Sequence, residues 1–379
     1  MDFDFNDEQL SLRDAVARWV ERAHGFDRRH GLAKSGGASR AVYGELAELG
    51  LTALAVPEAH GGMGFGPVEA MVVMEELGRG LVSAPYAQGA LLAPALLAQG
   101  DEALQSDWLP RVADGSALVV LAHQERGMRY DLGVCTTRAA PVDGAGSATA
   151  SAWQLSGHKR VVPAGDEADA YIVPARLPAG SIGLFLVERS AKGVGVRGYP
   201  TQDGARAADV ALSDAPARLI QADAQAALEW AMDIGIAAQS AEAVGLMDRL
   251  VATTVEYLNT RKQFGVALSS FQALRHRVAD VKMQLELARS MSYYATLKLG
   301  EPAGPRRRSL SQAKVQLNQS VRFVGQQCIQ LHGGIGVTDE YMASHLFKRL
   351  TMIELAWGDT PHHLGEVSSR MTDTAGVFA

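Results

Sequence analysis

The sequence has little cysteine, no long apolar run and no surplus of positive charge. Cys135 and Cys328 are the only cysteines among 379 residues, and they form no CxxC pair. A disulfide framework is therefore not expected, and a reducing, cytoplasmic location is favoured. A formal net charge of −6 argues against a nucleic-acid surface. No window approaches 18 uninterrupted apolar residues, so no membrane span is predicted.

The common catalytic signatures are missing as well. The chain contains no GxGxxG motif between a predicted strand and a predicted helix, and no GxxxxGK[ST], HExxH or GxSxG motif. His332, His345 and the pair His362-His363 follow no recognised ligand spacing, so no metal is predicted. The N-terminal stretch MDFDFNDEQLSLRDAV lacks the basic and apolar regions of a signal peptide.

The residues that are present change character twice, which predicts three domains of an α+β protein. Residues 1–115 are expected to be helical, with a first cap at Asn6 or Asp7 and a later one at Asp101. The apolar stripe expected on the first helix consists of Leu10, Ala15, Val16, Trp19 and Val20. This first part is predicted to be an N-terminal helical domain.

Residues 116–222 hold short runs rich in Val, Leu and Ile, separated by Gly, Pro and Asp at roughly ten-residue spacing. That spacing predicts a middle β-barrel or sandwich domain. Residues 223–379 return to helical periodicity, and their helices are expected at about 223–259, 270–299, 309–331 and 339–357. They predict a C-terminal four-helix bundle. The segment 300–308 is expected to be a linker, with Arg306 to Arg308 in a solvated loop.

The stretch from Gln326 to His363 has the composition of an active-site segment. Its glycines at 333, 334 and 336 leave the backbone bare for close approach to a ligand. Thr338 or Asp339 is expected to cap a helix of about 19 residues that Gly358 ends. Met342, Leu346, Leu350, Ile353 and Trp357 form its predicted apolar face. A carboxylate, Asp359, follows at the far end.

A second informative stretch is RKQFG, from Arg261 to Gly265, followed by Phe271 and Gln272. A guanidinium can hold a pyrophosphate through two parallel hydrogen bonds. The alternative is that Arg261 and Lys262 complement the C-terminus of the preceding helix.

Both stretches resemble the C-terminal signatures of the acyl-CoA dehydrogenase family: RKQFGVALSSFQALRHRVADVKMQLELAR and IQLHGGIGVTDEY. The resemblance continues toward the N-terminus in FNDEQLSLRDAVARWV, LAELGLTALAVPEAHGGMGFG and VVMEELGRGL. It covers nearly the whole chain. Within the family, QERGMRYDL, RGYPTQDG and FKRLTMIE are most similar to small subunits of the type found in pimeloyl-CoA dehydrogenase.

The resemblance implies FAD-dependent α,β-dehydrogenation of an acyl-CoA thioester. Arg261 matches an arginine that contacts the FAD pyrophosphate in a neighbouring subunit. The other positions that match the family's FAD contacts are Gln263, Phe264, Gln272, Gln330, Gly333 and Gly334 on the dinucleotide side and Thr360 on the flavin side. Gln124 is a further expected flavin-side contact, although it stands in Gln124-Glu125-Arg126 where the family usually has a Thr-Glu-Pro run. An FAD site built by two chains implies a homo- or hetero-oligomer, a dimer or tetramer. Electron-transfer flavoprotein is the expected electron acceptor.

The resemblance fails at the catalytic base. Family members carry a glutamate before the Gly-Thr of the last turn or on the first bundle helix, and those positions are Gly358 and Gly235 here. Val161 and Pro163 stand where an aromatic residue and a Thr or Ser flank the flavin ring, and proline has no N–H to donate.

Three hypotheses follow. In the first, the chain is a dehydrogenase with Asp359 as its base. The alternative for Asp359 is an ordinary capping or turn carboxylate. Asp233 and Glu354 are weaker candidates for the base, and they are expected to be a surface charge and a helix charge. In the second, the chain is a non-catalytic partner that completes the FAD site of a separate catalytic chain, such as a large subunit. In the third, it is an acyl-CoA-binding scaffold without flavin.

Overall fold

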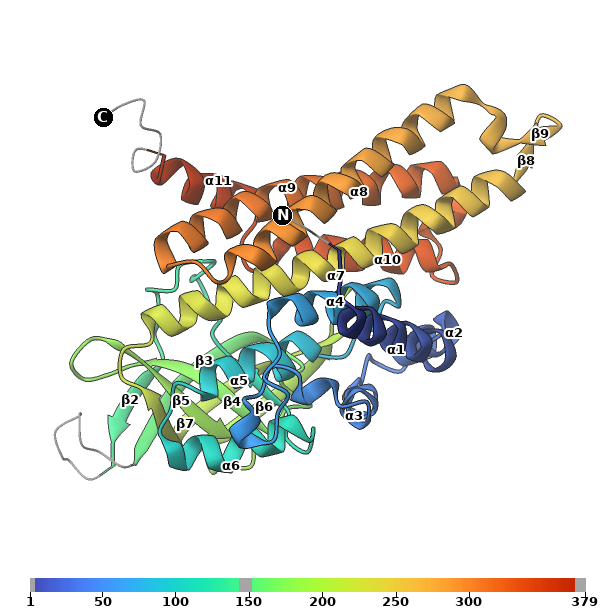
Figure 1. The fold of residues 1–379 in the computed structure, drawn as a ribbon. Coiled ribbons are helices and arrows are strands. Elements are labelled where there is room, and N and C mark those ends of the chain that lie inside the picture. Colours follow the sequence, from blue (N-terminus) through green and yellow to red (C-terminus); the bar gives the residue numbers. More distant parts are fainter. Residues whose placement is uncertain (1–3, 143–151, 372–379) are drawn as a thin grey trace. The chain divides into compact units, whose positions relative to one another are not determined.

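The computed structural model describes residues 4–142 and 152–371, and its described residues form two compact units (Figure 1). Each unit is assembled from segments that are separate in the sequence. Unit 1 contains Met1–Gly31, Pro67–Val82 and Ile236–Ala379, and unit 2 contains Leu32–Gly66 and Ser83–Gly235.

The described residues of unit 2 form a sheet of seven strands. They are β1 (Val119–Leu121), β2 (Arg138–Pro141), β3 (Trp153–Pro163), β4 (Ala170–Arg176), β5 (Ile182–Glu188), β6 (Val194–Pro200) and β7 (Arg206–Gln221). The pairing runs from β4 through β5, β7, β3 and β2 and returns to β4, so the sheet closes into a barrel. Strand β6 extends the barrel beside β7, and β1 lies parallel to β4. The prediction of a middle β barrel is confirmed.

The barrel interior is filled by apolar and aromatic side chains. Trp153 and Phe185 meet edge to face with ring centroids 5.5 Å apart. The buried hydroxyl of Tyr171 donates a 2.6 Å hydrogen bond to the Gly165 carbonyl. The helical elements of this unit are α3 (Arg40–Glu48), η1 (Leu51–Ala53), η2 (Glu58–His60), η3 (Ala87–Leu92), α5 (Ala93–Leu97) and α6 (Glu102–Ala113). Tyr43 of α3 belongs to the same core as the barrel residues.

Unit 1 is helical. Its helices are α1 (Asp7–Ala23), most of α2 (Phe26–Lys34), α4 (Pro67–Arg79), the greater part of α7 (Gln225–Thr260), α8 (Gln272–Lys298), α9 (Ala303–His332), α10 (Met342–Leu355) and α11 (Thr360–Ser369). Helices α8 and α9 run side by side along much of their length (Figure 1). The core between α7, α8, α9 and α10 is apolar and includes Leu246, Leu285, Leu317 and Leu346. This confirms the predicted C-terminal bundle.

Helices α4 and α7 approach each other so closely that only glycine fits at two positions. A Cβ added to Gly78 would collide with the backbone carbonyl of Glu242, and one added to Gly245 would collide with that of Glu75. Beside this contact, Arg79 forms ion pairs with Glu75, Glu76 and Asp248. Gly78 and Gly245 therefore have a packing role in this unit.

The structure changes the prediction at α9 and α11 and confirms the predicted cap of α1. Helix α9 begins at Ala303, so the linker is shorter than 300–308 and Arg306 to Arg308 are helical. Pro305 is tolerated there because the first N–H groups of a helix have no intrahelical partner. Helix α11 was not predicted. On α1 the Asn6 cap is confirmed by a reciprocal bond with Gln9, but Ala15 is exposed.

Helix α10 is also shorter than predicted, with 14 residues from Met342 to Leu355. Its N-cap is Tyr341, which makes no side-chain capping bond, so the caps expected at Thr338 or Asp339 are wrong. The carboxylate of Asp339 instead contacts His30 and Lys348. No helix within residues 4–142 and 152–371 is long and apolar enough to cross a bilayer.

Candidate functional site

Residues 262–267 form a two-stranded hairpin between α7 and α8, where the first helix ends and before the second begins (Figure 1). Its strands β8 (Lys262–Gln263) and β9 (Val266–Ala267) pair in antiparallel register. Phe264 and Gly265, the two turn residues, have φ of 54° and 82°, which is the geometry of a type I′ turn. Phe264 is 91% exposed, and Arg261, Gln263 and Gln272 are exposed as well.

The glycine turn follows α9 as a short 3-10 helix, η5 (Gly333–Val337). Gly333 has φ of 64°, and added Cβ atoms on Gly333 or Gly334 would meet nothing within 4 Å. Gln330 lies exposed one turn earlier. The turn therefore presents bare, accessible backbone.

Two rings connect the glycine turn to the hairpin. His332 packs against Tyr257 with centroids 4.8 Å apart, and the Tyr257 carbonyl accepts a 2.9 Å hydrogen bond from the Arg261 amide. His332 is fixed on its other side by the Cys328 carbonyl, 2.8 Å from Nδ1. The structure thus links the residue one turn before Arg261 to the residue directly before the Gly333 turn, and no contact of Gln263 or Phe264 with that turn is seen within the described residues. The contacts of Arg261, Gln263 and Phe264 with FAD stay a prediction.

Asp359 and Thr360 lie in the turn between α10 and α11, which we call the last turn (residues 356–360). Asp359 is the N-cap of α11, and its Oδ1 accepts a 2.9 Å hydrogen bond from the His362 amide. Thr360 is the first residue of that helix. The carboxylate is partly exposed, and no bond to Oδ2 is recorded within the described residues. Asp359 has the position and contact of a helix cap.

The family's usual base position is closed in this turn. Gly358 has φ of 120°, a conformation that L-amino acids rarely adopt. An added Cβ would lie well inside 3.0 Å of the rings of His362 and His363. The His363 ring is buried and held by the Trp357 carbonyl, 3.0 Å from Nε2, and by Ser311 Oγ, 3.2 Å from Nδ1. Burial, together with Lys314, lowers the pKa of His363 to about 3, so the imidazole is neutral.

The weaker candidates for the base are engaged elsewhere. Asp233 is 1% exposed, so the expectation of a surface charge there is wrong. Glu354 lies on α10 with Arg322 3.6 Å away, as a helix charge does.

In unit 2 a buried ion pair fastens three chain segments together. Lys159 Nζ of β3 donates a 2.6 Å hydrogen bond to Glu125 Oε1, which follows β1. The amides and hydroxyls of Thr136 and Thr137 donate four more bonds to the same carboxylate. Burial tends to raise the Glu125 pKa, but Lys159 and the threonine hydroxyls outweigh burial and lower it to about 2. Glu125 is therefore a fully satisfied anion.

The flavin-side positions adjoin this pair. Gln124 is half-buried, with Nε2 3.2 Å from His123 Nε2, and its carbonyl accepts a 2.8 Å bond from the Arg160 amide. Burial and the Lys159 ammonium lower the pKa of His123 to about 3. Val161 has φ of 49° and is 53% exposed, and Pro163 ends β3 without a donor.

Sequence reasoning missed Glu125, Lys159, Lys314 and His363. Their signal is weak, because a charged residue in a strand or helix is usually exposed and the sequence does not show which face it occupies. The pairing of Glu125 with Lys159 spans 34 residues and depends on the barrel.

His30, Asp339 and His345 are the one group of side chains, among the described residues, close enough to share a metal ion. The hydrogen bonds that these side chains already make argue against metal binding. His345 Nε2 lies 2.7 Å from the Asp339 carbonyl and must donate to it, while Nδ1 lies 3.2 Å from Arg29 Nη1 and must accept. That tautomer leaves no lone pair at Nε2 for a metal. Lys348 adds a positive charge 3.2 Å from Asp339.

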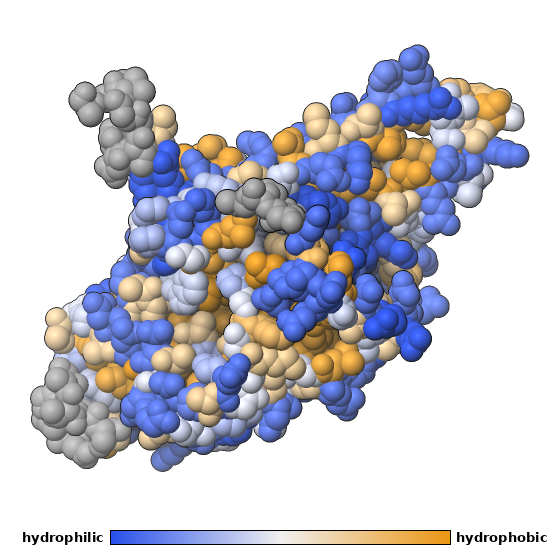
Figure 2. Space-filling model, in the orientation of Figure 1, coloured by the Kyte–Doolittle hydropathy of each residue, from blue (hydrophilic) through white to orange (hydrophobic). Residues whose placement is uncertain are grey.

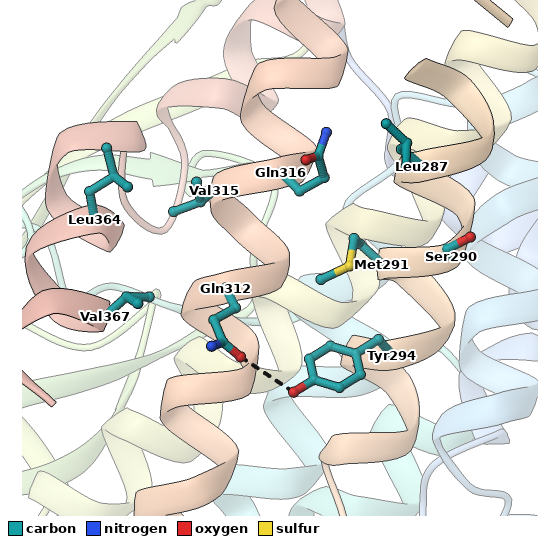
Figure 3. A pocket seen from close by; sticks show the side chains of 9 residues that line it. All are labelled: Leu287, Ser290, Met291, Tyr294, Gln312, Val315, Gln316, Leu364 and Val367. Carbon is teal, nitrogen blue, oxygen red and sulfur yellow. Dashed lines mark hydrogen bonds between the residues drawn. The ribbon is translucent and has the colours of Figure 1, made fainter. Parts of the chain in front are cut away.

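The outer surface of the bundle contains an apolar groove of about 660 Å³ between α8, α9 and α11 (Figure 3). The dashed line in Figure 3 marks a hydrogen bond between Tyr294 and Gln312. Leu287, Met291 and Leu364 line the groove with apolar side chains (Figure 3). Hydrophobic side chains also interrupt the hydrophilic surface over the bundle in Figure 2. Exposed examples on α8 and α11 are Met283, Leu287, Leu297 and Leu364.

The dinucleotide-side residues fit the FAD that the resemblance implies. Arg261 offers a charged fork, Gln263, Gln272 and Gln330 offer amides, and the Gly333–Gly334 backbone is open. All of these groups face solvent, which suits a dinucleotide approached from another chain. The flavin side fits less well, because Pro163 cannot donate a hydrogen bond there.

Family models match two parts of the chain. Residues 6–116 match the acyl-CoA dehydrogenase N-terminal domain, and residues 226–372 match the acyl-CoA dehydrogenase C-terminal domain. Among curated relatives, acyl-CoA dehydrogenase FadE27 of Mycobacterium tuberculosis is 26% identical over 88% of this chain and 89% of its own length. The mitochondrial short-chain specific acyl-CoA dehydrogenase of Sus scrofa is 26% identical over 83% of this chain and 78% of its own.

Solved structures give the same result over the full length. A variant of the Tcur3481-Tcur3483 steroid ACAD superposes with a TM-score of 0.86 at 29% identity and covers 98% of this chain and 99% of its own. The ChsE4-ChsE5 complex from Mycobacterium tuberculosis superposes with a TM-score of 0.87 at 25% identity, covering 99% of this chain and 100% of its own.

Proposed function

Because the chain belongs to the acyl-CoA dehydrogenase family, we propose that it works as one subunit of a hetero-oligomer and completes an FAD site whose base another chain supplies. The family consists of FAD-dependent oxidoreductases that act on the CH–CH bond of an acyl-CoA thioester. FAD is therefore the cofactor and acyl-CoA dehydrogenation the reaction. The proposal concerns this chain's share of it.

The last turn is the observation that carries the proposal. The reaction needs a carboxylate within about 3 Å of the α-carbon whose proton it removes. Residue 358 has neither a side chain nor room for one beside His363, and the Asp359 carboxylate caps α11. FAD, when bound, supplies the acceptor for the hydride that leaves Cβ. This chain contributes Arg261, Gln330 and the Gly333 turn, which are exposed toward a ligand held from outside.

Two further observations support a hetero-oligomer. The two solved structures described above are, by their names, complexes of two different components. The bundle also carries exposed apolar side chains on α8 and α11 around the groove in Figure 3. Large exposed apolar surface commonly marks an interface. We propose electron-transfer flavoprotein as electron acceptor and a reducing, cytoplasmic location, which suits two buried free thiols.

A second candidate function is that of a dehydrogenase in which Asp359 is the base. It is favoured by the free Oδ2 and partial exposure of that carboxylate within the described residues. The Asp359→Asn and Asp359→Ala variants separate the two functions. Asparagine caps a helix about as well as aspartate but cannot act as a base, whereas alanine does neither.

The experiment compares the chain alone with the complex it forms with a candidate large subunit, using visible absorbance. We expect no stoichiometric flavin on the chain alone, and flavin bleaching by acyl-CoA in the complex that survives Asp359→Asn. A chain that holds FAD by itself, is bleached by acyl-CoA and loses bleaching in Asp359→Asn but not in the matched control Asp223→Asn would overturn the proposal.

A further inference from the structure

One face of α9 holds the backbone at the end of α10 and in the last turn. Lys314 Nζ donates a 2.6 Å hydrogen bond to the Ile353 carbonyl, and Asn318 Nδ2 donates one of 3.4 Å to the Gly358 carbonyl. Ser311, one turn earlier, holds the His363 ring that bonds the Trp357 carbonyl. Ser311, Lys314 and Asn318 recur at helical spacing, so they project from the same side of α9.

Lys314 is an unusual residue for that position. It is fully buried, and no ion pair to its ammonium is recorded among the described residues. Taking a charged amine out of water is costly unless it is bonded. Burial lowers the pKa of Lys314 to about 7, with Glu354 opposing that change. An apolar side chain would fill the same space without the free-energy cost of desolvating an amine. The hydrogen bond to the Ile353 carbonyl is therefore the contact that lysine makes and an apolar residue could not.

Ile353 supplies one of the last four carbonyls of α10, which have no intrahelical partner. Directly after it the chain leaves the helix: the Ala356 amide still bonds to Met352, then Trp357 adopts φ of 60° and Gly358 φ of 120°. Asp359 and Thr360 follow at once as the start of α11. The place of Thr360 thus depends on how α10 ends.

We propose that Lys314 is a positioning residue, which fixes the end of α10 through the Ile353 carbonyl and thereby the path of the last turn up to Thr360. The inference rests on the proposed function in one respect, because Thr360, which matches a flavin-side position of the family, matters only if this chain completes an FAD site. Lys314 itself touches neither cofactor nor substrate in this assignment. It acts through the backbone that it holds.

The first test uses the chain alone and requires no FAD. Hydrogen exchange is measured for Lys314→Met and wild type in peptides covering 354–363 and 333–341. We expect exchange in 354–363 to become about tenfold faster in Lys314→Met, as loss of a buried hydrogen bond implies, with 333–341 unchanged. The control is Lys282→Met on α8, whose ammonium is half-exposed and, among the described residues, pairs with Glu286. Unchanged exchange in 354–363 would overturn the proposal.

The second test uses the complex with its catalytic partner. We expect Lys314→Met to weaken FAD binding several-fold and to alter the visible circular dichroism of the flavin, with the KM for acyl-CoA near wild type. A looser turn with unchanged FAD affinity and flavin spectrum would also contradict the positioning role. If Lys314→Met does not fold, Asn318→Leu, which removes only the bond to Gly358, serves in both tests with a smaller expected effect. Failure of the proposed function can be told apart from failure of the positioning role, because only the former would show as FAD bound to the chain alone.

Discussion

The imidazole of His363 occupies the space that a side chain at Gly358 would need. Its ring is held by the Trp357 carbonyl and Ser311, so it cannot swing aside without losing both contacts. The position at which the family carries its glutamate is therefore closed by this chain's own packing.

Substitution of Gly358 is expected to be strongly unfavourable. Gly358→Ala meets the His363 ring and adopts an unsuitable φ, so we expect a loss of about 1–3 kcal/mol in the free energy of unfolding. The matched control is Gly365→Ala on α11, where an added Cβ meets nothing and stability should rise by about 0.5–1 kcal/mol. Urea denaturation measures both. Equal effects of the two substitutions would contradict the prediction.

The buried Lys314 makes stability depend on pH. The unfolded chain keeps the lysine proton up to its ordinary pKa of 10.5, whereas the folded chain releases it at about 7. As pH falls from 10.5 toward 7, only the unfolded state gains a proton, so stability is lost, by up to ~1.4 kcal/mol per pH unit. We expect the unfolding free energy of the wild type, minus that of Lys314→Met, to rise with pH across this window.

The Glu125–Lys159 pair is expected to behave as one unit. Lys159→Met strands a buried carboxylate, which should cost about 3–5 kcal/mol of unfolding free energy at pH 7. The double variant Glu125→Leu/Lys159→Met removes both charges and should be less destabilised than Lys159→Met. Strict additivity of the two single substitutions would argue against the pairing.

The same carboxylate should govern stability in acid. Its contribution is complete above pH 4.5 and is lost as pH falls toward about 2, because the folded-state pKa is the lower one. His123 and His363 act in the same direction, losing stability between pH 6.5 and about 3 as the unfolded chain takes up protons first. Thermal unfolding of wild type and Glu125→Gln from pH 7 to 3 measures the carboxylate's share.

Arg261 and Phe264 are expected to contribute to FAD binding in the complex and not to the stability of the fold. Both side chains are exposed, so Arg261→Ala and Phe264→Ala should change the free energy of unfolding of the chain alone by less than about 0.5 kcal/mol. In the complex, each should weaken FAD binding, measured by flavin fluorescence titration. Lys348→Ala on α10 is the control, since the bond that its ammonium makes within residues 4–142 and 152–371 is to Asp339.

The sequence was sufficient for features that depend on neighbouring residues. The caps at Asn6 and Asp101 form as predicted, because each needs only an amide three residues ahead. The bundle helices and barrel strands followed from periodicity. Asp339 was assigned wrongly as a cap because its partners, His30 and Lys348, come from outside that local stretch.

The candidate site depended more on distant contacts. A lysine at 314 and a histidine at 363 do not differ in sequence from exposed ones, and only the packing of α9 against the last turn shows them buried. Likewise, a choice between base and cap for Asp359 required knowing that a helix begins at Thr360, and α11 has no long apolar period of its own that would predict it.

The type I′ turn at Phe264–Gly265 has a consequence for the entropy of association. A hairpin with two residue pairs is marginal by itself, so ordering it on contact with another chain would reduce affinity. A turn whose twist matches its strands pre-organises the tip, and that ordering cost is met during folding instead. Gly265→Ala should therefore slow association of the two chains, although residue 265 presents no side chain to a partner.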